Sequence, residues 1–368
     1  MELTSVRQLF REKEQFAGQK VTVGGWVRSN RDSKNFGFLV VNDGTFFEPL
    51  QVVYAADKLD NYTDIAKNEI MSVYGSQEGM AHIAWALCDP GDVVLTPNPG
   101  YPIFSIGPSL CGADVRTYPL YRENGFLPKL SDIPQETAKA AKYMLVSYPL
   151  NPVCATANDA FYEELIAFAR KYNVIILHDN AYSDIIYGGR KGKSFLSYEG
   201  AKEVGVEFYS LSKSYNLTGA RISFVIGNQK IVDKFRAVRT QFDYGVFLPI
   251  QYGAAAALNG PQDAVTAQCE EYERRNQAFC GGLRSIGWDV PDSEGTMFVW
   301  APVPKGHGTS EEFCMELMEK AGVIGVPGSS FGSLGEGFMR FALVEPVPVM
   351  EEIVKAIDES GLLKEKGE

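Results

Sequence analysis

The pattern of apolar and polar positions divides this 368-residue chain into two parts that meet near residue 70. In the first part, β-branched and aromatic residues predict short strands at 21–23, 26–27, 38–41 and 50–54. A helix at 5–14 precedes these strands, a turn at Asn42-Asp43-Gly44 separates two of them, and a helix at about 60–67 follows. Residues 1–69 are therefore predicted to form a small antiparallel β unit.

From Gly75 onward, helical and strand patterns alternate, which is typical of a sheet covered by helices on both faces. Phe161, Leu165, Phe168 and Tyr172 are spaced to form one buried stripe of a helix, and Asn158 is placed to cap it. The predicted helices of this part are 76–87, 102–110, 158–172, 231–240, 249–258 and 261–286, and the strands are 93–96, 115, 143–147, 174–177, 206–211 and 222–226.

The C-terminal residues predict a smaller α+β unit, with strands at 297–301 and 338–343 and helices at 310–321 and 349–360. We therefore expect three domains: an N-terminal β unit over 1–69, a large α/β domain over 70–285 and a small domain over 286–368.

Composition excludes several classes of protein. The formal charge of −11 discourages broad nucleic-acid binding, although residues 1–70 are nearly balanced, with nine basic and ten acidic side chains. The six cysteines form no CxxC pair and no metal-spaced cluster with histidine, so we expect neither a disulfide frame nor a metal site. The apolar runs are too short to span a bilayer and no secretion signal is visible. We therefore expect a cytoplasmic protein.

Polar residues directly after strands are the first candidates for a site, because open α/β sheets bind ligands beyond the carboxyl ends of their strands. Four such points occur: Gly75-Ser76-Gln77, Asn151, Asp179 and the segment 210–213. A single lysine after a strand is usually a solvated surface charge. Lys213, however, follows Ser210 by three residues and precedes Arg221 by eight, so that both flanking residues could reach one anion.

The segment SLSKSYNLTGAR, residues 210–221, resembles the cofactor-attachment signature of the class I/II (fold type I) aminotransferases. Together with GSQEG, residues 75–79, it is similar to the branch near the LL-diaminopimelate and aspartate aminotransferases. The resemblance implies an α/β fold of type I, with a mostly parallel sheet in the large domain. It also implies that Lys213 carries pyridoxal 5′-phosphate as an aldimine.

The same resemblance implies roles for the residues around that cofactor. Its phosphate would be held by Gly75, Ser76 and Gln77 at a helix N-terminus and by Ser210, Ser212 and Arg221. In HDNAY, residues 178–182, Asp179 would pair with the pyridine nitrogen and Tyr182 would bond the ring hydroxyl. Tyr101 would stack on the ring. Asn151 would bond the ring oxygen, although Val153 and Cys154 depart from the family pattern after it.

Arg340, in FMRFAL, resembles the family arginine that binds the substrate α-carboxylate, with Asn151 beside it. The implied function is ping-pong transfer of an amino group between an amino acid and a 2-oxo acid, by a homodimer, with a small dicarboxylic or similar donor. Lys213 would move the proton, which requires a neutral amine.

Residues 18–54 instead resemble the anticodon-binding OB-fold of asparaginyl-tRNA synthetases, on the pattern GWVR, RD, ND and LQVV. By that resemblance, Phe38 and Gln51 would contact anticodon bases, with Arg28 near the backbone. The resemblance covers only part of the barrel. The aminotransferase resemblance, over residues 70–368, lacks by family expectation about the first 80 to 90 residues.

Three interpretations stay open at this stage. The chain is an active aminotransferase, a tRNA-binding module fused to a catalytically impaired pyridoxal-phosphate scaffold, or an inactive fusion. The residues alone do not identify the amino-group donor, the oligomeric state or the origin of the fusion.

Overall fold

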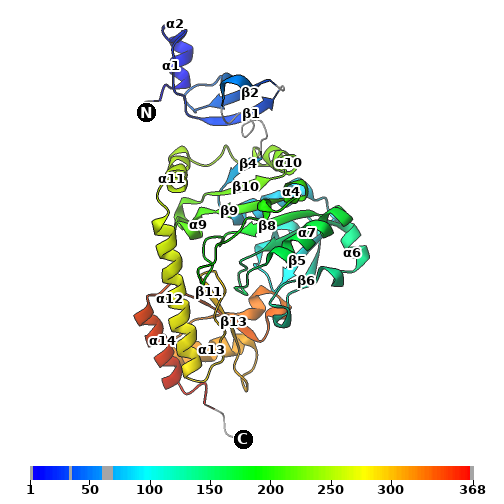
Figure 1. The fold of residues 1–368 in the computed structure, drawn as a ribbon, viewed down its shortest axis with the longest axis vertical. Helices are drawn as coiled ribbons and strands as arrows, with labels where there is room; N and C mark the ends of the chain where they lie inside the picture. Colours follow the sequence, from blue (N-terminus) through cyan, green and yellow to red (C-terminus); the bar gives the residue numbers. More distant parts are fainter. Residues whose placement is uncertain (1–2, 33–34, 60–68, 365–368) are drawn as a thin grey trace.

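The computed structural model describes residues 3–32, 35–59 and 69–364. Figure 1 shows the N-terminal β unit at one end of the long axis, an α/β layer in the middle and the C-terminal unit at the other end. Within these ranges, no helix combines the length and the apolar character that crossing a bilayer requires.

The N-terminal unit is an antiparallel sheet with the order β1-β2-β3. Its elements are α1 (Val6–Arg11), α2 (Lys13–Phe16), β1 (Trp26–Asp32), β2 (Phe36–Asn42), β3 (Leu50–Ala55) and η1 (Ala56–Lys58). Two predictions are wrong in detail: residues 21–23 form no strand, and the helix predicted at 5–14 breaks at Glu12 into two. The helix predicted at about 60–67 lies outside the described residues.

The central sheet has seven strands in the order β4-β10-β9-β8-β7-β5-β6. β10 runs antiparallel to both of its neighbours, β4 and β9, and the other four strand pairs are parallel, so the sheet is mostly parallel, as predicted. The strands are β4 (Ile70–Val73), β5 (Val93–Asn98), β6 (Asp114–Pro119), β7 (Ala141–Ser147), β8 (Ile175–Asn180), β9 (Gly205–Ser210) and β10 (Ser223–Gly227).

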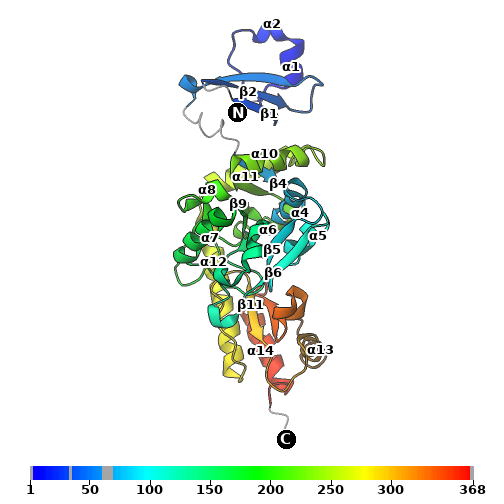
Figure 2. The same cartoon turned by 90° about the vertical axis from the view of Figure 1, so that its right-hand side faces the viewer.

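Helices cover both faces of this sheet; in Figure 2, α7 and α8 lie on one side of it and α4 and α5 on the other. The predicted cap of α7 is confirmed, because the side chain of Asn158 accepts a hydrogen bond from the Phe161 amide. The helices of this part are α4 (Ser76–Leu87), α5 (Ile103–Ser109), α6 (Gln135–Ala140), α7 (Asp159–Tyr172), α8 (Ala201–Val204), α9 (Leu211–Ser214), α10 (Gln229–Arg239) and α11 (Leu248–Asn259), with short 3-10 turns η2 (Arg122–Asn124), η3 (Leu130–Asp132), η4 (Phe195–Ser197) and η5 (Thr218–Ala220).

The C-terminal unit is built on a small antiparallel sheet of order β11-β13-β12. The long helix α12 leads into it, and the C-terminal turns of α12 bury Phe279 and Leu283 in a second core with Trp288 and Ile357. Its elements are α12 (Asp263–Ser285), β11 (Phe298–Pro302), α13 (Ser310–Ala321), β12 (Val326–Pro327), η6 (Gly328–Phe331), η7 (Ser333–Gly335), β13 (Phe338–Ala342) and α14 (Val347–Glu359).

Candidate active site

One cavity of about 240 Å³ lies at the carboxyl ends of β7, β8 and β9 and extends to β11 and β13 of the C-terminal unit. It brings together all twelve residues that the sequence nominated as cofactor or substrate ligands, although the role of each stays a prediction. They are Gly75, Ser76, Gln77, Tyr101, Asn151, Asp179, Tyr182, Ser210, Ser212, Lys213, Arg221 and Arg340.

Lys213 stands in the four-residue helix α9 rather than in an open loop. The hydroxyl oxygen of Ser210 caps this helix by accepting from the Ser212 amide at 3.2 Å, and Gln268 donates to the Lys213 carbonyl at 2.6 Å. Burial lowers the pKa of the Lys213 amine, and the guanidinium charges of Arg221 and Arg340 lower it further. Both effects make the amine easier to deprotonate than a solvent-exposed lysine.

The anion-binding end of the cavity is the N-terminus of α4. Gly75 precedes the helix at φ +92°, and no side chain among the described residues caps it, so the first amides of α4 can bind an anion. The Ser76 hydroxyl is buried there without a partner in the described chain. Arg221 donates to the carbonyls of Thr218 at 3.0 Å and Tyr74 at 3.2 Å, which places its guanidinium beside the same helix end.

Asp179 is the last residue but one of β8 and lies in a buried position beside Ser147 of β7. Burial raises the pKa of its carboxyl to about 7, with a further rise from the charge of Glu207, against the lowering effect of a hydrogen bond from Ser147. Its Oδ1 atom has no hydrogen-bond partner within the described residues. An unpaired buried oxygen of this kind is satisfied when a ligand donates a hydrogen bond to it.

Two tyrosines contribute aromatic surface to the cavity. Tyr101 donates its hydroxyl hydrogen to Gln77 at 2.9 Å, which ties the ring to the first turn of α4. Tyr182 is buried, and its ring packs edge-on against Phe298 with 6.1 Å between centroids.

Arg340 reaches the cavity from β13 of the C-terminal unit. Its Nη1 atom donates to the side-chain oxygen of Asn151 at 2.7 Å, and its guanidinium lies over the rings of Phe298 and Phe331 at 4.2 and 4.7 Å. Its Nε–H is buried without a partner in the described chain. The guanidinium of Arg340 is therefore directed into the cavity.

These groups fit pyridoxal phosphate. The free amides of α4, the Ser76 hydroxyl and Arg221 suit a phosphate, and the unpaired Asp179 oxygen suits a protonated ring nitrogen. The amine of Lys213 suits an aldehyde carbon.

The cavity also contains residues that sequence reasoning did not nominate: Met80, Phe104, Ser147, Ala181, Thr218 and Phe298. Ser147 and Ala181 flank nominated positions at strand ends, so proximity in sequence was an available signal. Thr218 lies inside the lysine segment itself. Nothing in the local sequence distinguishes Met80 and Phe298 from core residues.

Comparison with known proteins agrees with this geometry. Residues 54–357 match the family described as aminotransferase class I and II. The chain is 44% identical over 291 residues to an LL-diaminopimelate aminotransferase of Desulforudis audaxviator, covering 79% of this chain and 74% of that protein. A protein of the same description from Moorella thermoacetica is 42% identical over 291 residues, with the same coverage of both chains.

Solved structures show the same fold. A substrate-bound BacF structure from Bacillus subtilis superposes with a TM-score of 0.79 at 35% identity, covering 81% of this chain and 76% of that one. A probable N-succinyldiaminopimelate aminotransferase from Thermus thermophilus gives a TM-score of 0.75 at 34% identity, with 79% and 78% covered.

Proposed function

The chain belongs to the class I and II aminotransferase family, and from this premise we propose that it uses Lys213 to transfer the amino group of LL-diaminopimelate to a 2-oxo acid. That it is a pyridoxal-phosphate-dependent aminotransferase follows from the family match and from relatives of 40–44% identity over most of the chain. The identity of the donor is the proposed part, supported by the description that those relatives share.

The observation that carries the role of Lys213 is its place in the cavity. Its amine shares one cavity with the guanidinium of Arg340 and with an Asp179 carboxyl oxygen that has no partner in the described part of the chain. When bound, pyridoxal phosphate supplies an aldehyde that takes up the amino group and a ring that accepts electrons from the substrate α-carbon. Asp179, as a carboxylate, would hold a proton on the ring nitrogen.

Two further roles follow from the geometry. Arg340, already oriented by Asn151, would bind the substrate α-carboxylate through its guanidinium edge. Lys213, with its lowered pKa, would act as a neutral amine that accepts the proton from the substrate α-carbon. It would then deliver this proton to the carbon on the other side of the transferred nitrogen. Ping-pong kinetics would follow, because the 2-oxo acid formed from the first substrate leaves before the second substrate binds.

The assignment of Lys213 is tested by Lys213→Ala. We expect amino transfer to fall by about 10²–10⁴-fold or more, together with loss of the visible cofactor band that borohydride reduces. Lys230→Ala, an exposed lysine of α10, is the matched control and should behave as the wild type. A borohydride-sensitive band of wild-type strength in Lys213→Ala would refute the assignment.

The donor is tested by comparing LL-diaminopimelate with L-aspartate, each with 2-oxoglutarate as acceptor. We expect kcat/KM to be at least about tenfold higher for LL-diaminopimelate, a difference of about 1.4 kcal/mol in transition-state binding. Equal or higher kcat/KM for aspartate would refute the donor while leaving the transferase activity intact.

A homodimer is also proposed, on the basis of an exposed aromatic surface beside the cavity. Tyr244, Phe247 and Tyr252 are 84%, 67% and 50% exposed. The segment that carries them packs, through Val246, in one cluster with Leu211 of the lysine helix. Large apolar side chains exposed together are typical of an interface.

We also propose that the N-terminal unit is part of an OB-fold. This is supported by its three antiparallel strands and by the guanidinium of Arg31, which lies 5.2 Å from the ring centroid of Phe38. The family match begins only at residue 54. The tRNA-binding alternative for the whole chain is not favoured. A gel-shift assay with tRNA-Asn at low salt tests the unit, and no shift for the intact chain would refute it.

A further inference from the structure

A cluster of charged side chains lies behind the anion-binding end of the cavity, outside the cavity lining itself. Arg239 is only 3% exposed, and it meets two carboxylates. Its Nε atom lies 3.1 Å from Glu78 Oε1 and 2.7 Å from Asp243 Oδ2. A buried guanidinium requires such partners, because an unpaired charge in the interior is strongly unfavourable.

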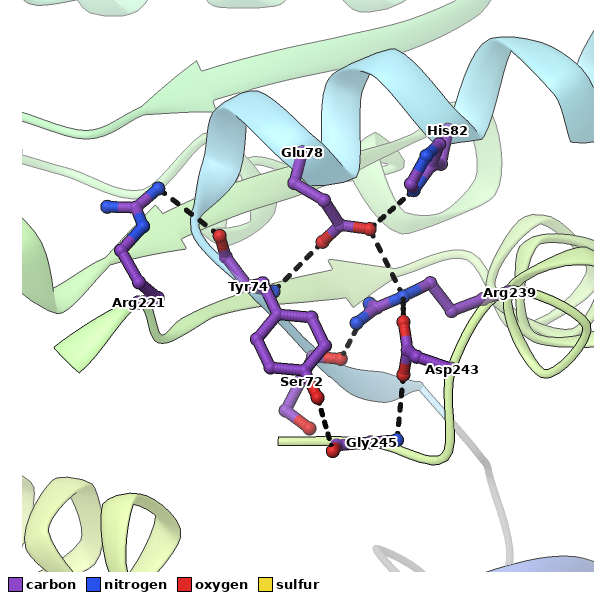
Figure 3. Close-up of polar contacts among 8 residues, drawn as sticks. All are labelled: Ser72, Tyr74, Glu78, His82, Arg221, Arg239, Asp243 and Gly245. Carbon is purple, nitrogen blue, oxygen red and sulfur yellow. Dashed lines mark hydrogen bonds and ion pairs between the residues drawn. The ribbon is translucent and has the colours of Figure 1, made fainter. Parts of the chain in front are cut away.

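Glu78 connects this cluster to the turn that leads into α4. Its Oε2 atom accepts from the Tyr74 amide at 2.9 Å, while Oε1 contacts His82 Nδ1 at 2.6 Å as well as Arg239. In Figure 3, one oxygen of Glu78 is joined to both His82 and Arg239, and its second oxygen is directed at Tyr74. Arg239 also donates to the Ser72 carbonyl at 3.2 Å, so both charged residues hold the backbone of 72–74.

Tyr74 connects the charged cluster to the cavity, because it contacts residues of both. Its amide is held by Glu78, its hydroxyl donates to the Gly245 carbonyl at 2.6 Å, and the Arg239 guanidinium lies 5.2 Å from its ring centroid. Its carbonyl accepts from Arg221 at 3.2 Å, and Arg221 lines the cavity. The orientation of the Tyr74 peptide therefore affects both Arg221 and the following Gly75.

We propose that Glu78 and Arg239 are positioning residues that hold the Tyr74–Gly75 turn, and through it the α4 amides and Arg221, in the arrangement that binds the cofactor phosphate. The inference rests on the proposed function, because it takes the α4 N-terminus as the phosphate site. The Ser76 hydroxyl, buried at that helix end and without a partner among the residues that the structure describes, independently points to a ligand there.

Positioning and simple electrostatics predict opposite effects for Glu78→Gln. Removing a negative charge near a bound phosphate should strengthen binding if only charge matters. An amide, however, cannot accept from Arg239, His82 and Tyr74 together, because one of its two ends donates. The Tyr74–Gly75 turn then loses one of its anchors, and positioning predicts weaker phosphate binding.

The experiment titrates the full chain with pyridoxal phosphate and, separately, with pyridoxal, which lacks the phosphate. We expect Glu78→Gln to weaken pyridoxal phosphate binding by about tenfold, as for one lost hydrogen bond to a charged group, and to change pyridoxal binding by less than about twofold. Arg239→Lys keeps the positive charge but loses the planar guanidinium that can bond several partners at once, so it should also weaken pyridoxal phosphate binding. Glu359→Gln, in an exposed ion pair with Lys355, is the control.

The outcomes distinguish the positioning role of Glu78 and Arg239 from the phosphate site itself. Unchanged or tighter pyridoxal phosphate binding in both Glu78→Gln and Arg239→Lys, in proteins that melt as the wild type does, overturns the positioning role alone. Equal weakening for pyridoxal and pyridoxal phosphate also overturns it, because it shows general loosening of the site. Failure of the wild type to bind pyridoxal phosphate more tightly than pyridoxal overturns the phosphate site itself.

Discussion

Asp179 illustrates how one buried residue connects stability with cofactor binding. Its carboxyl is buried, one oxygen is unpaired within the described chain, and its pKa is raised to about 7. A carboxyl that binds its proton more tightly in the folded chain than in the unfolded one opposes folding once the unfolded form ionises. The residue therefore costs stability in the cofactor-free protein, and a ring nitrogen that donates to it would offset that cost.

Asp179→Asn should remove this pH dependence. As pH rises from about 4 toward 7, the unfolded chain loses a proton that the folded chain keeps, so wild-type stability without cofactor falls across that window by up to about 4 kcal/mol. Urea or thermal melts between pH 5 and 8 measure the slope. Asp358→Asn, an exposed carboxylate of α14, should keep the wild-type slope; a similar slope in Asp179→Asn would contradict the prediction.

Gly75→Ala tests a single backbone position. Gly75 has φ +92° and ψ 152°, which L-residues rarely adopt, and an added Cβ would stand 2.2 Å from Arg221 Nη2. We expect a loss of about 1–3 kcal/mol in the free energy of unfolding, with weaker pyridoxal phosphate binding as Arg221 is displaced. Gly253→Ala, in α11 with open space around it, should be neutral or stabilising; equal losses in the two variants would argue against strain at Gly75.

At the scale of elements, helix ends and buried stripes were predictable and short elements were not. The helix 76–87 and the helix 310–321 occur with the predicted bounds, since periodicity and capping signals are local. The strand β4 has only four residues, and it exists because it pairs with β10 about 150 residues later. The short helix α9 under Lys213 escaped prediction for a similar reason, because four residues show no period.

Asn158→Ala tests the most explicit of the element predictions. The lost hydrogen bond, 2.9 Å from Asn158 Oδ1 to the Phe161 amide, should lower stability by about 1 kcal/mol, seen as a lower Tm. Cofactor binding should not change, because α7 contributes no residue to the cavity. Glu163→Ala, exposed on the same helix, provides the reference; a comparable Tm loss there would show that capping is not the cause.

At the scale of the whole molecule, the order of the strands produces the site. Ser147 and Asp179 lie at the ends of β7 and β8, and Asn151 and Lys213 follow β7 and β9. These three strands are neighbours in the sheet, so the four side chains meet at one edge. Arg340 then arrives from a second sheet about 130 residues beyond Lys213. The N-terminal unit adds a different contact: a Cβ at Gly24 would lie 2.7 Å from the Tyr252 hydroxyl, which places that loop against α11.

The proposed dimer gives a prediction at this scale. Phe247→Asp places a charge in the exposed aromatic surface and should shift the protein from dimer toward monomer, measured by sedimentation velocity over a concentration series. Phe47→Asp is the control, because Phe47 is fully exposed in the N-terminal unit. A dimer of unchanged affinity in Phe247→Asp, or a wild-type monomer at all concentrations, would contradict the proposed interface.

The sequence by itself determined the alternation of helices and strands and the small antiparallel unit before it, because these patterns are local signals. Through the family resemblance of its motifs it also nominated twelve of the residues that line the cavity. Only the tertiary structure decided that Arg340 donates to Asn151 and that Asp179 has an oxygen unpaired within the described chain. It also decided that Glu78 and Arg239 bond the backbone of residues 72–74. These depend on distances between segments far apart in the chain and on how deeply each side chain is buried. Local sequence carries no information on those quantities.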